Sequence, residues 1–381
     1  MGGGKSAAAS QNLRARGAHI VVGATKPNGA PAEACTAGIT PSHLWSFLTC
    51  LAAAGAALGW ALLAPEPAVG ARFASEQLRW GRAALMRFRF VPGSTPLSSP
   101  WAPAVAVACY AAALVGCRRH VARRVRSYDV QLRPLVFAHS AALCCLSAAL
   151  LAALSAALLP EYIAAGGGVA GAVRVWCDPR PHALTTHAAT AVYYANYLLK
   201  YYELFDTVLL ALRGRPTPML HVFHHAATLV LCWSQVSNSP ARTAALSLSG
   251  YTHLLPPRAQ LVDDTAAQVV PISLNLAVHV AMYAYYAMTT LGHEVVWKRH
   301  LTRAQIAQFA ADVPACGAAL LLRVNAERSW GWFGGETYCR GTHRAAYAGI
   351  GLLAAYLALF VKLYVDTYVH RSRARSKAKM A

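Results

Sequence analysis

The segment LHVFHH, residues 220–225, carries three histidines: His221, His224 and His225. Because residues three and four apart on a helix are neighbours, these imidazoles share one face. Neutral imidazoles can bind iron or zinc. A histidine can also attack a thioester as a nucleophile, while a second one acts as acid, base or oxyanion donor. The segment therefore predicts either a metal centre or a nucleophilic active site.

Three other apolar segments carry polar side chains at helical spacing. Lys200, Glu203 and Asp206 follow one another at intervals of three residues in KYYELFDT. Lys200 and Glu203 could also form a structural ion pair, and glutamines can bridge helices. Since ionisable groups are costly at bilayer depth, we expect all these sets to face one polar interior. The second set is Asn275, His279, Met282, Tyr283 and Tyr286, and the third is Thr302, Gln305 and Gln308.

The composition is typical of a membrane protein. Of the 381 residues, 56% are hydrophobic and 13% are charged, and the mean hydropathy is +0.35. A soluble domain usually carries about 25% charged residues, so a soluble globular protein and a disordered one are both excluded. The net charge of +20 comes from basic residues clustered between apolar runs. That pattern indicates cytosolic loops of a membrane protein, and we expect no nucleic-acid partner.

Seven segments are apolar enough to cross a lipid bilayer, which needs about 20 residues per helix. An eighth candidate, 44–64, lies in an N-terminal extension of residues 1–95. The sequence thus predicts an all-α membrane protein that ends in a basic tail at 371–381. The seven segments are approximately 100–117, 134–158, 189–212, 219–238, 267–290, 303–324 and 344–366.

Basic residues indicate which side of the membrane is cytosolic. If the seven segments span, four basic regions fall on one side: 118–133, 213–215, 298–303 and 371–379. The chain ends KAKMA, and lysines so placed resemble an endoplasmic-reticulum retrieval signal. We therefore expect a multi-pass protein of the endoplasmic reticulum membrane with a cytosolic C-terminus. The arginines between 79 and 89 fall on the opposite side and oppose this rule.

The histidine count favours nucleophilic catalysis over a metal centre. Membrane di-iron desaturases and hydroxylases also use HxxHH, but they need several such boxes. This chain has one; His182 and His187 are not in that spacing, and His139 is isolated. We therefore expect no metal. A di-iron enzyme is the first alternative, and a non-enzymatic membrane carrier that binds through the polar interior is the second.

Taken together and in this order, KYYELFDT, LHVFHHAAT, NLAVHVAMYAYY and TRAQIAQF resemble the ELO family of fatty acid elongases. The resemblance covers approximately residues 96–370 and is closest to fungal-type members. It implies seven helices, six of which enclose an acyl tunnel. It also implies the condensing step of elongation, in which a long-chain acyl-CoA and malonyl-CoA give a 3-oxoacyl-CoA, CO2 and CoA without a further cofactor.

The resemblance implies residue roles as well. His224 would be the acyl-accepting nucleophile, assisted by His225 and His279, with His221 completing the box. A lumenal disulfide would join Cys177 to Cys339. The other enzymes of the elongation cycle would be neighbours, and a homodimer stays open. Further polar residues would orient the site or bind substrate, namely Lys200, Glu203, Asp206, Asn275, Tyr283, Tyr286, Gln305 and Gln308.

The chain departs from the family pattern in two places. One is the N-terminal extension, and the other is an insertion at about 239–264. We expect the insertion to lie in a lumenal loop, away from chemistry on the cytosolic side.

Overall fold

The computed structural model describes residues 41–63, 83–124, 128–177, 183–237, 268–330, 339 and 343–370. All regular secondary structure in these residues is helical. The predicted insertion at 239–264, the basic tail at 371–381 and residues 1–40 of the extension lie outside the described residues.

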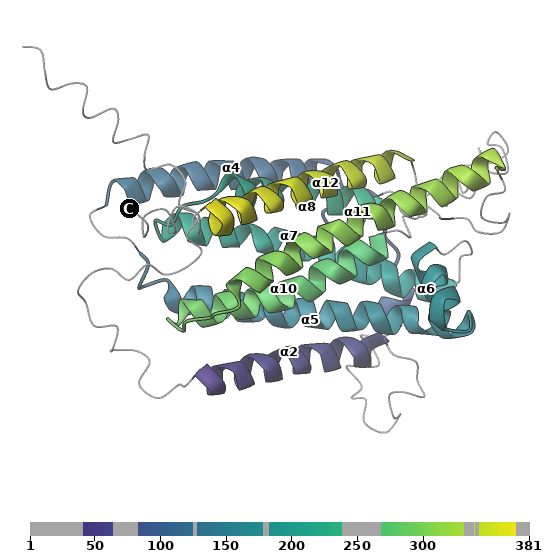
Figure 1. Ribbon diagram of the computed structural model, residues 1–381, viewed down its shortest axis with the longest axis horizontal. Helices are drawn as coiled ribbons and strands as arrows, with labels where there is room; N and C mark the ends of the chain where they lie inside the picture. The colour runs from purple at the N-terminus through teal and green to yellow at the C-terminus, as the bar shows by residue number, and fades with distance from the viewer. Residues whose placement is uncertain are drawn as a thin grey trace, which may run out of the picture.

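Each predicted span corresponds to one helix (Figure 1). The short helix α6 was not predicted; it begins at the last of three consecutive glycines, Gly166 to Gly168, whose φ angles are all positive. The helices are α2 (Pro41–Leu63), α4 (Trp101–Ala122), α5 (Arg133–Ala164), α6 (Gly168–Cys177), α7 (Ala183–Leu212), α8 (Met219–Ser237), α10 (Val269–Thr290), α11 (Lys298–Arg328) and α12 (His343–Tyr364). A π-helical turn, Val365–His370, continues α12.

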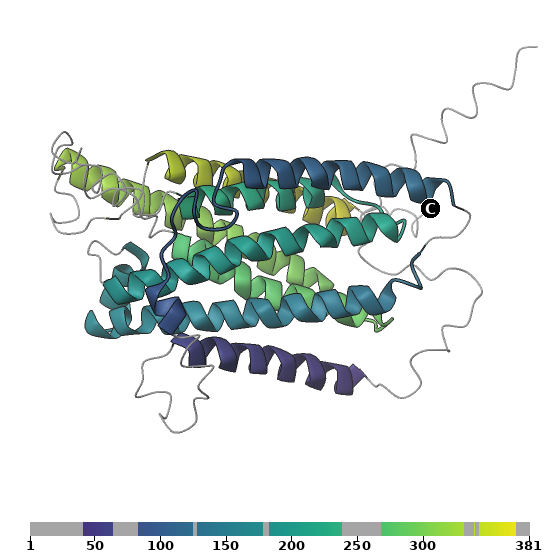
Figure 2. The ribbon, with the colours of Figure 1, turned by 180° about the vertical axis from the view of Figure 1, so that it is seen from behind.

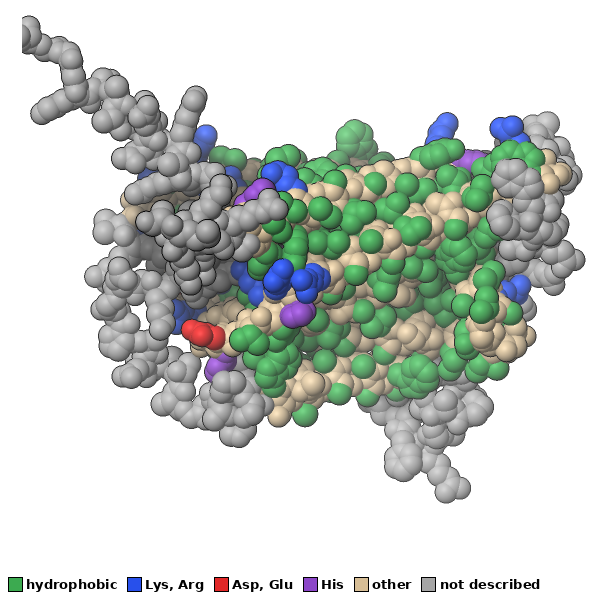
Figure 3. Space-filling model, in the orientation of Figure 1, with side chains coloured by type: hydrophobic (Ala, Val, Ile, Leu, Met, Phe, Trp, Pro, Cys, Tyr) green, Lys and Arg blue, Asp and Glu red, His purple; other side chains and the backbone are tan. Residues whose placement is uncertain are grey.

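The long helices lie side by side, as expected of a multi-pass membrane protein (Figures 1 and 2). By length and composition, five of the described helices could cross a membrane: α4, α5, α10, α11 and α12 with its continuation. Apolar side chains cover the middle of the face seen in Figure 3, and most of its charged side chains lie towards the two ends. This distribution matches a protein whose middle is surrounded by lipid.

Helix α5 packs against α2 on one side and against α10 on another. Leu48 of α2 is buried in a cluster with Leu143 of α5 and Tyr285 of α10. Further along α2, Gly55 and Gly59 lie against the backbone carbonyls of Cys145 and Ala149. A Cβ atom at either glycine would collide with those oxygens, so only glycine allows this close approach.

Two further clusters complete the packing around the interior. One joins α4, α7 and α8 through Tyr110, Tyr197 and Leu229. The other joins α11 to α12 through Phe309 and Phe360. These clusters hold α7, α8, α11 and α12 in fixed positions around the polar side chains that the sequence singled out.

An ion-pair cluster that we call the clasp, formed by Asp129 with Arg213 and Arg215, joins the loop before α5 to the loop between α7 and α8. Asp129 accepts hydrogen bonds from Arg213 Nε at 2.7 Å and from Arg215 Nε and Nη2 at 3.1 and 2.9 Å. Burial opposes ionisation of Asp129, but the Arg215 hydrogen bonds and the two guanidinium charges outweigh it, so the pKa of Asp129 lies below its ordinary value. This clasp fixes the entry to α8 and hence to the histidine box.

Candidate active site

A buried ion pair within α7 contacts two polar residues of α10. Lys200 Nζ donates to Glu203 Oε1 at 2.8 Å and to Asn275 Oδ1 at 2.9 Å. His279 completes the group, because its Nε2 lies 3.1 Å from Asn275 Nδ2 and its Nδ1 lies 3.3 Å from Glu203 Oε1. Lys200 and Glu203 are 2% and 1% exposed, so each charge depends on the other for compensation.

Asp206 forms a second group one turn along α7. Its Oδ1 lies 2.8 Å from His139 Nε2 on α5, and its Oδ2 accepts a hydrogen bond from the Tyr283 hydroxyl at 2.7 Å. His225 Nε2 lies 3.9 Å from the same Oδ2 atom. His139, which stands in no histidine box in the sequence, thus has a partner 67 positions away in the chain.

The three histidines of α8 lie together, as predicted. The rings of His221 and His225 are 4.5 Å apart, and those of His224 and His225 are 5.6 Å apart. His224 also packs against Tyr356 of α12, with ring centroids 4.7 Å apart. The Tyr356 hydroxyl donates to the carbonyl of His224 at 3.2 Å and lies 2.9 Å from Thr228 Oγ1. Sequence reasoning did not find Thr228 or Tyr356.

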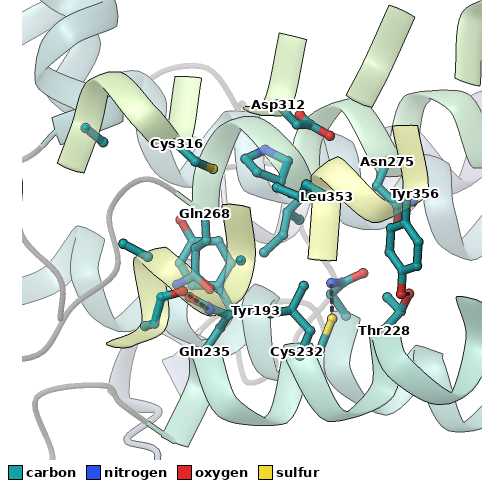
Figure 4. Close-up of a pocket in the computed structure, with 18 of the residues that line it drawn as sticks. Tyr193, Thr228, Cys232, Gln235, Gln268, Asn275, Asp312, Cys316, Leu353 and Tyr356 are labelled. Atoms are coloured by element: carbon teal, nitrogen blue, oxygen red, sulfur yellow. Dashed lines mark hydrogen bonds between the residues drawn. The ribbon is translucent and has the colours of Figure 1, made fainter. Parts of the chain in front are cut away.

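A cavity that we call the first chamber extends from His224 between α7, α8, α10, α11 and α12 (Figure 4). Its wall is mainly apolar and includes Tyr193, Leu231, Ile272 and Leu353. It reaches Cys339, which forms a disulfide with Cys177 at the end of α6. The structure thus pairs the two cysteines that the resemblance named.

A second chamber lies on the other side of His224 and is more polar. Its wall contains the remaining histidines of the site, His221, His225 and His279, together with Tyr286 and Gln305. It extends to Lys298 and Tyr368, at the predicted cytosolic ends of α11 and α12. Gln305 donates to Met282 Sδ at 3.5 Å, and Gln308 donates to Asp312 Oδ2 at 3.4 Å.

His224 therefore lies between two chambers of different character. Four residues line both cavities: His224, Asn275, Gln308 and Phe309. The structure brings every predicted site residue except the two cysteines into this junction, the second chamber or the two buried polar groups beside them. In the described part of the chain, no three His, Cys, Asp or Glu side chains are arranged to hold a metal ion.

The structure thus places a buried histidine box between a mainly apolar chamber and a more polar one, within a bundle of long apolar helices. The chain belongs to the ELO family, described as the GNS1/SUR4 family, whose model matches residues 95–254 and 259–376. Helix α2 lies outside the matched residues.

Several curated proteins are similar to the chain. "Putative fatty acid elongase 1" of Schizosaccharomyces pombe is 32% identical over 71% of this chain and 70% of that protein. "Fatty acid elongase A" of Dictyostelium discoideum is 31% identical over 60% of this chain and 70% of its own length. "Very long chain fatty acid elongase 7" of Rattus norvegicus is 32% identical over 39% of this chain and 47% of its own length.

The protein is accordingly a fatty acid elongase, the condensing enzyme (3-oxoacyl-CoA synthase) of fatty acid elongation. Membership of this family implies acyl-CoA and malonyl-CoA as its substrates.

Proposed function

We propose that His224 takes the acyl group from acyl-CoA and passes it to malonyl-CoA. The observation that carries this proposal is the place of His224 in the wall of both chambers. The apolar first chamber suits an acyl chain, and the polar second chamber, which extends to Lys298, suits the anionic CoA and malonyl groups. An acyl carbonyl bound to His224 would lie where the two meet.

The reaction proceeds in two steps. In the first, an imidazole nitrogen of His224 bonds to the acyl carbonyl carbon, the carbon–sulfur bond breaks, and CoA leaves with the imidazole proton. In the second, malonyl-CoA loses CO2, and the electron pair of that carbon–carbon bond attacks the acyl carbonyl. The carbon–nitrogen bond then breaks, which releases the 3-oxoacyl-CoA, and the imidazole of His224 takes up one proton from solvent.

The other histidines suit proton transfer and charge stabilisation. His279 faces the second chamber and is held by Asn275 and Glu203, so its ring is oriented before the substrate arrives. His225 lies between His221 and Asp206, and both His221 and His225 line the second chamber. We assign His279 to the malonyl thioester and His225 to the proton of His224.

The test is to trap the acylated enzyme. Purified protein is incubated with a radiolabelled acyl-CoA without malonyl-CoA, quenched, digested and examined by mass spectrometry. We expect the acyl group on the peptide that contains His224, with release of CoA, and its discharge when malonyl-CoA is added. His224→Ala should abolish the adduct, whereas His120→Ala, an exposed histidine at the end of α4, should not. An adduct on another residue, or product formation by His224→Ala, would overturn the proposal.

The seven family spans, with six helices around the acyl tunnel, are part of the same proposal, and α2 is proposed as an eighth span. With 23 residues, α2 is about 34 Å long, which is enough to cross the hydrocarbon core. It runs parallel to α5, since Gly55 meets Cys145 and Gly59 meets Ala149. Its first turns lie beside Trp297, which precedes the basic start of α11. The N-terminus would therefore be cytosolic, as is the C-terminus in the orientation predicted for the endoplasmic reticulum.

This topology can be tested with engineered glycosylation acceptors. An acceptor placed between residues 64 and 82 should be glycosylated, and one placed before residue 41 should not. Fluorescence of a tagged chain, with and without its last five residues, would test retention in the endoplasmic reticulum. A glycan before residue 41 would show that α2 does not have the proposed direction. The other elongation-cycle enzymes as neighbours, and a homodimer, stay predictions.

A further inference from the structure

The first chamber contains hydrogen-bond acceptors that no described residue satisfies. Asp312 is 0% exposed, and its Oδ1 atom has no hydrogen-bond partner among the described residues. The side-chain oxygens of Asn196, which is 1% exposed, and of Gln268 also have no hydrogen-bond partner among the described residues. All three residues line the first chamber, and they come from α7, from the residue before α10 and from α11 (Figure 4).

Two other polar side chains of this chamber make polar contacts with described residues. Gln235 donates to the carbonyl of Ala345, and Arg323 pairs with Glu327 at 2.8 Å. Asp312 itself is half satisfied, because Gln308 Nε2 donates to its Oδ2 at 3.4 Å. A buried acceptor without a hydrogen bond costs free energy. A plain hydrocarbon chain in this chamber has no donor to offer, so the acceptor would stay without a partner.

We propose that the first chamber accepts acyl chains that carry a hydroxyl group, which donates its hydrogen bond to Asp312 Oδ1. This inference rests on the proposed function, since it assumes that the acyl chain occupies this chamber. The hydroxyl would bring into the chamber the donor that Asp312 lacks, and Asp312 would remove the cost of burying the hydroxyl.

The place of Asp312 on α11 restricts the position of the hydroxyl on the chain. Gln308 lines both chambers, whereas Asp312, one turn further on, lines only the first. Four residues of helix separate the two by about 6 Å along the axis. The hydroxyl should therefore lie several carbons beyond the carbonyl, and at one preferred carbon.

The experiment uses the full-length enzyme and acyl-CoAs of one chain length, with the hydroxyl moved one carbon at a time. The unsubstituted chain reports whether condensation occurs at all, so failure of the proposed function and failure of this inference give different results. Relative to the unsubstituted chain, we expect kcat/KM to fall by about tenfold or more when the hydroxyl faces the apolar wall. At the one carbon that places the hydroxyl beside Asp312, kcat/KM should return towards the value of the unsubstituted chain.

Variants then connect the recovery to Asp312. In Asp312→Asn, the amide oxygen should stay with Gln308, so its NH2 group should face the chamber as a donor. The chain with an oxo group at the preferred carbon should then match or exceed the hydroxylated chain, whereas wild type should prefer the hydroxyl. Cys316→Ala, which changes the same wall one turn further along α11, should keep the wild-type order.

A single preferred carbon that loses its advantage in Asp312→Asn but not in Cys316→Ala supports the proposal. Equal rejection of the hydroxyl at every carbon by the wild-type enzyme, which needs no variant to fold, would overturn it. So would a preferred carbon that Asp312→Asn leaves unchanged.

Discussion

His139 and Asp206 join α5 to α7 within the polar interior, with His139 Nε2 2.8 Å from Asp206 Oδ1. Both side chains are at most 10% exposed. The other carboxylate oxygen of Asp206 accepts a hydrogen bond from Tyr283 and faces His225 at 3.9 Å. His139 lines neither chamber, so it acts on the histidine box only through the orientation of Asp206.

His139→Ala should lower kcat much more than it changes KM for either substrate. Asp206 would lose one of its two fixed partners, and a small displacement of a catalytic group can cost up to about 100-fold in rate. Steady-state kinetics in detergent would measure it. The pH profile of kcat should also change, which a merely structural role would not produce. Ser147→Ala removes another buried polar group of α5 that lies outside both chambers, and it should leave the profile as in wild type. Equal effects of the two substitutions would contradict the assignment.

The ion pair between Lys200 and Glu203 should show strong coupling. Lys200→Met or Glu203→Gln alone leaves one buried charge uncompensated and should lower the free energy of unfolding by about 3–5 kcal/mol. The double variant should be more stable than the sum of the single losses predicts, because no lone charge remains. Thermal unfolding of the four proteins gives this double-mutant cycle. Strictly additive losses would mean that the two charges do not compensate each other.

The clasp at Asp129 gives a pH-dependent contribution to stability. Its pKa is lowered in the folded protein, so the contribution is present above the ordinary carboxyl pKa and is lost as the pH falls through the folded value. Asp129→Asn should therefore lower the unfolding temperature at pH 7. The difference from wild type should shrink as the pH falls below about 4. A difference that stays constant to the lowest pH at which both proteins fold would contradict this account.

Close packing of α2 on α5 depends on glycine. Gly59→Ala places a Cβ atom against the carbonyl of Ala149, and the overpacking should cost about 1–3 kcal/mol. Gly116→Ala on α4 is the matched control, since nothing lies within 4 Å of the added atom. It should leave stability unchanged or raise it slightly, because alanine favours helix. Limited proteolysis before α2, with thermal unfolding, would compare the two. Equal stability of both variants would mean that α2 does not rest on α5 in this way.

The sequence by itself determined the helices, the membrane class, the histidine box and the family. Apolar length predicts a helix locally, and the intervals of three and four residues place Lys200 beside Glu203 and His221 beside His225 without tertiary information. The helix α6 was not predicted, because the glycines at its start interrupt the apolar run that would have indicated a helix.

The tertiary structure decided which helix faces meet. His139, Thr228 and Tyr356 each stand in an apolar run with no local partner, and their roles come from neighbours in other helices. Asp312 has Gln308 as a local partner, but its proposed role comes from the cavity that it lines. Packing of α8 between α7 and α12 likewise places His224, rather than His221 or His225, between the two chambers. Helical spacing puts the three imidazoles on one face, but only the surrounding helices determine which of them both chambers reach.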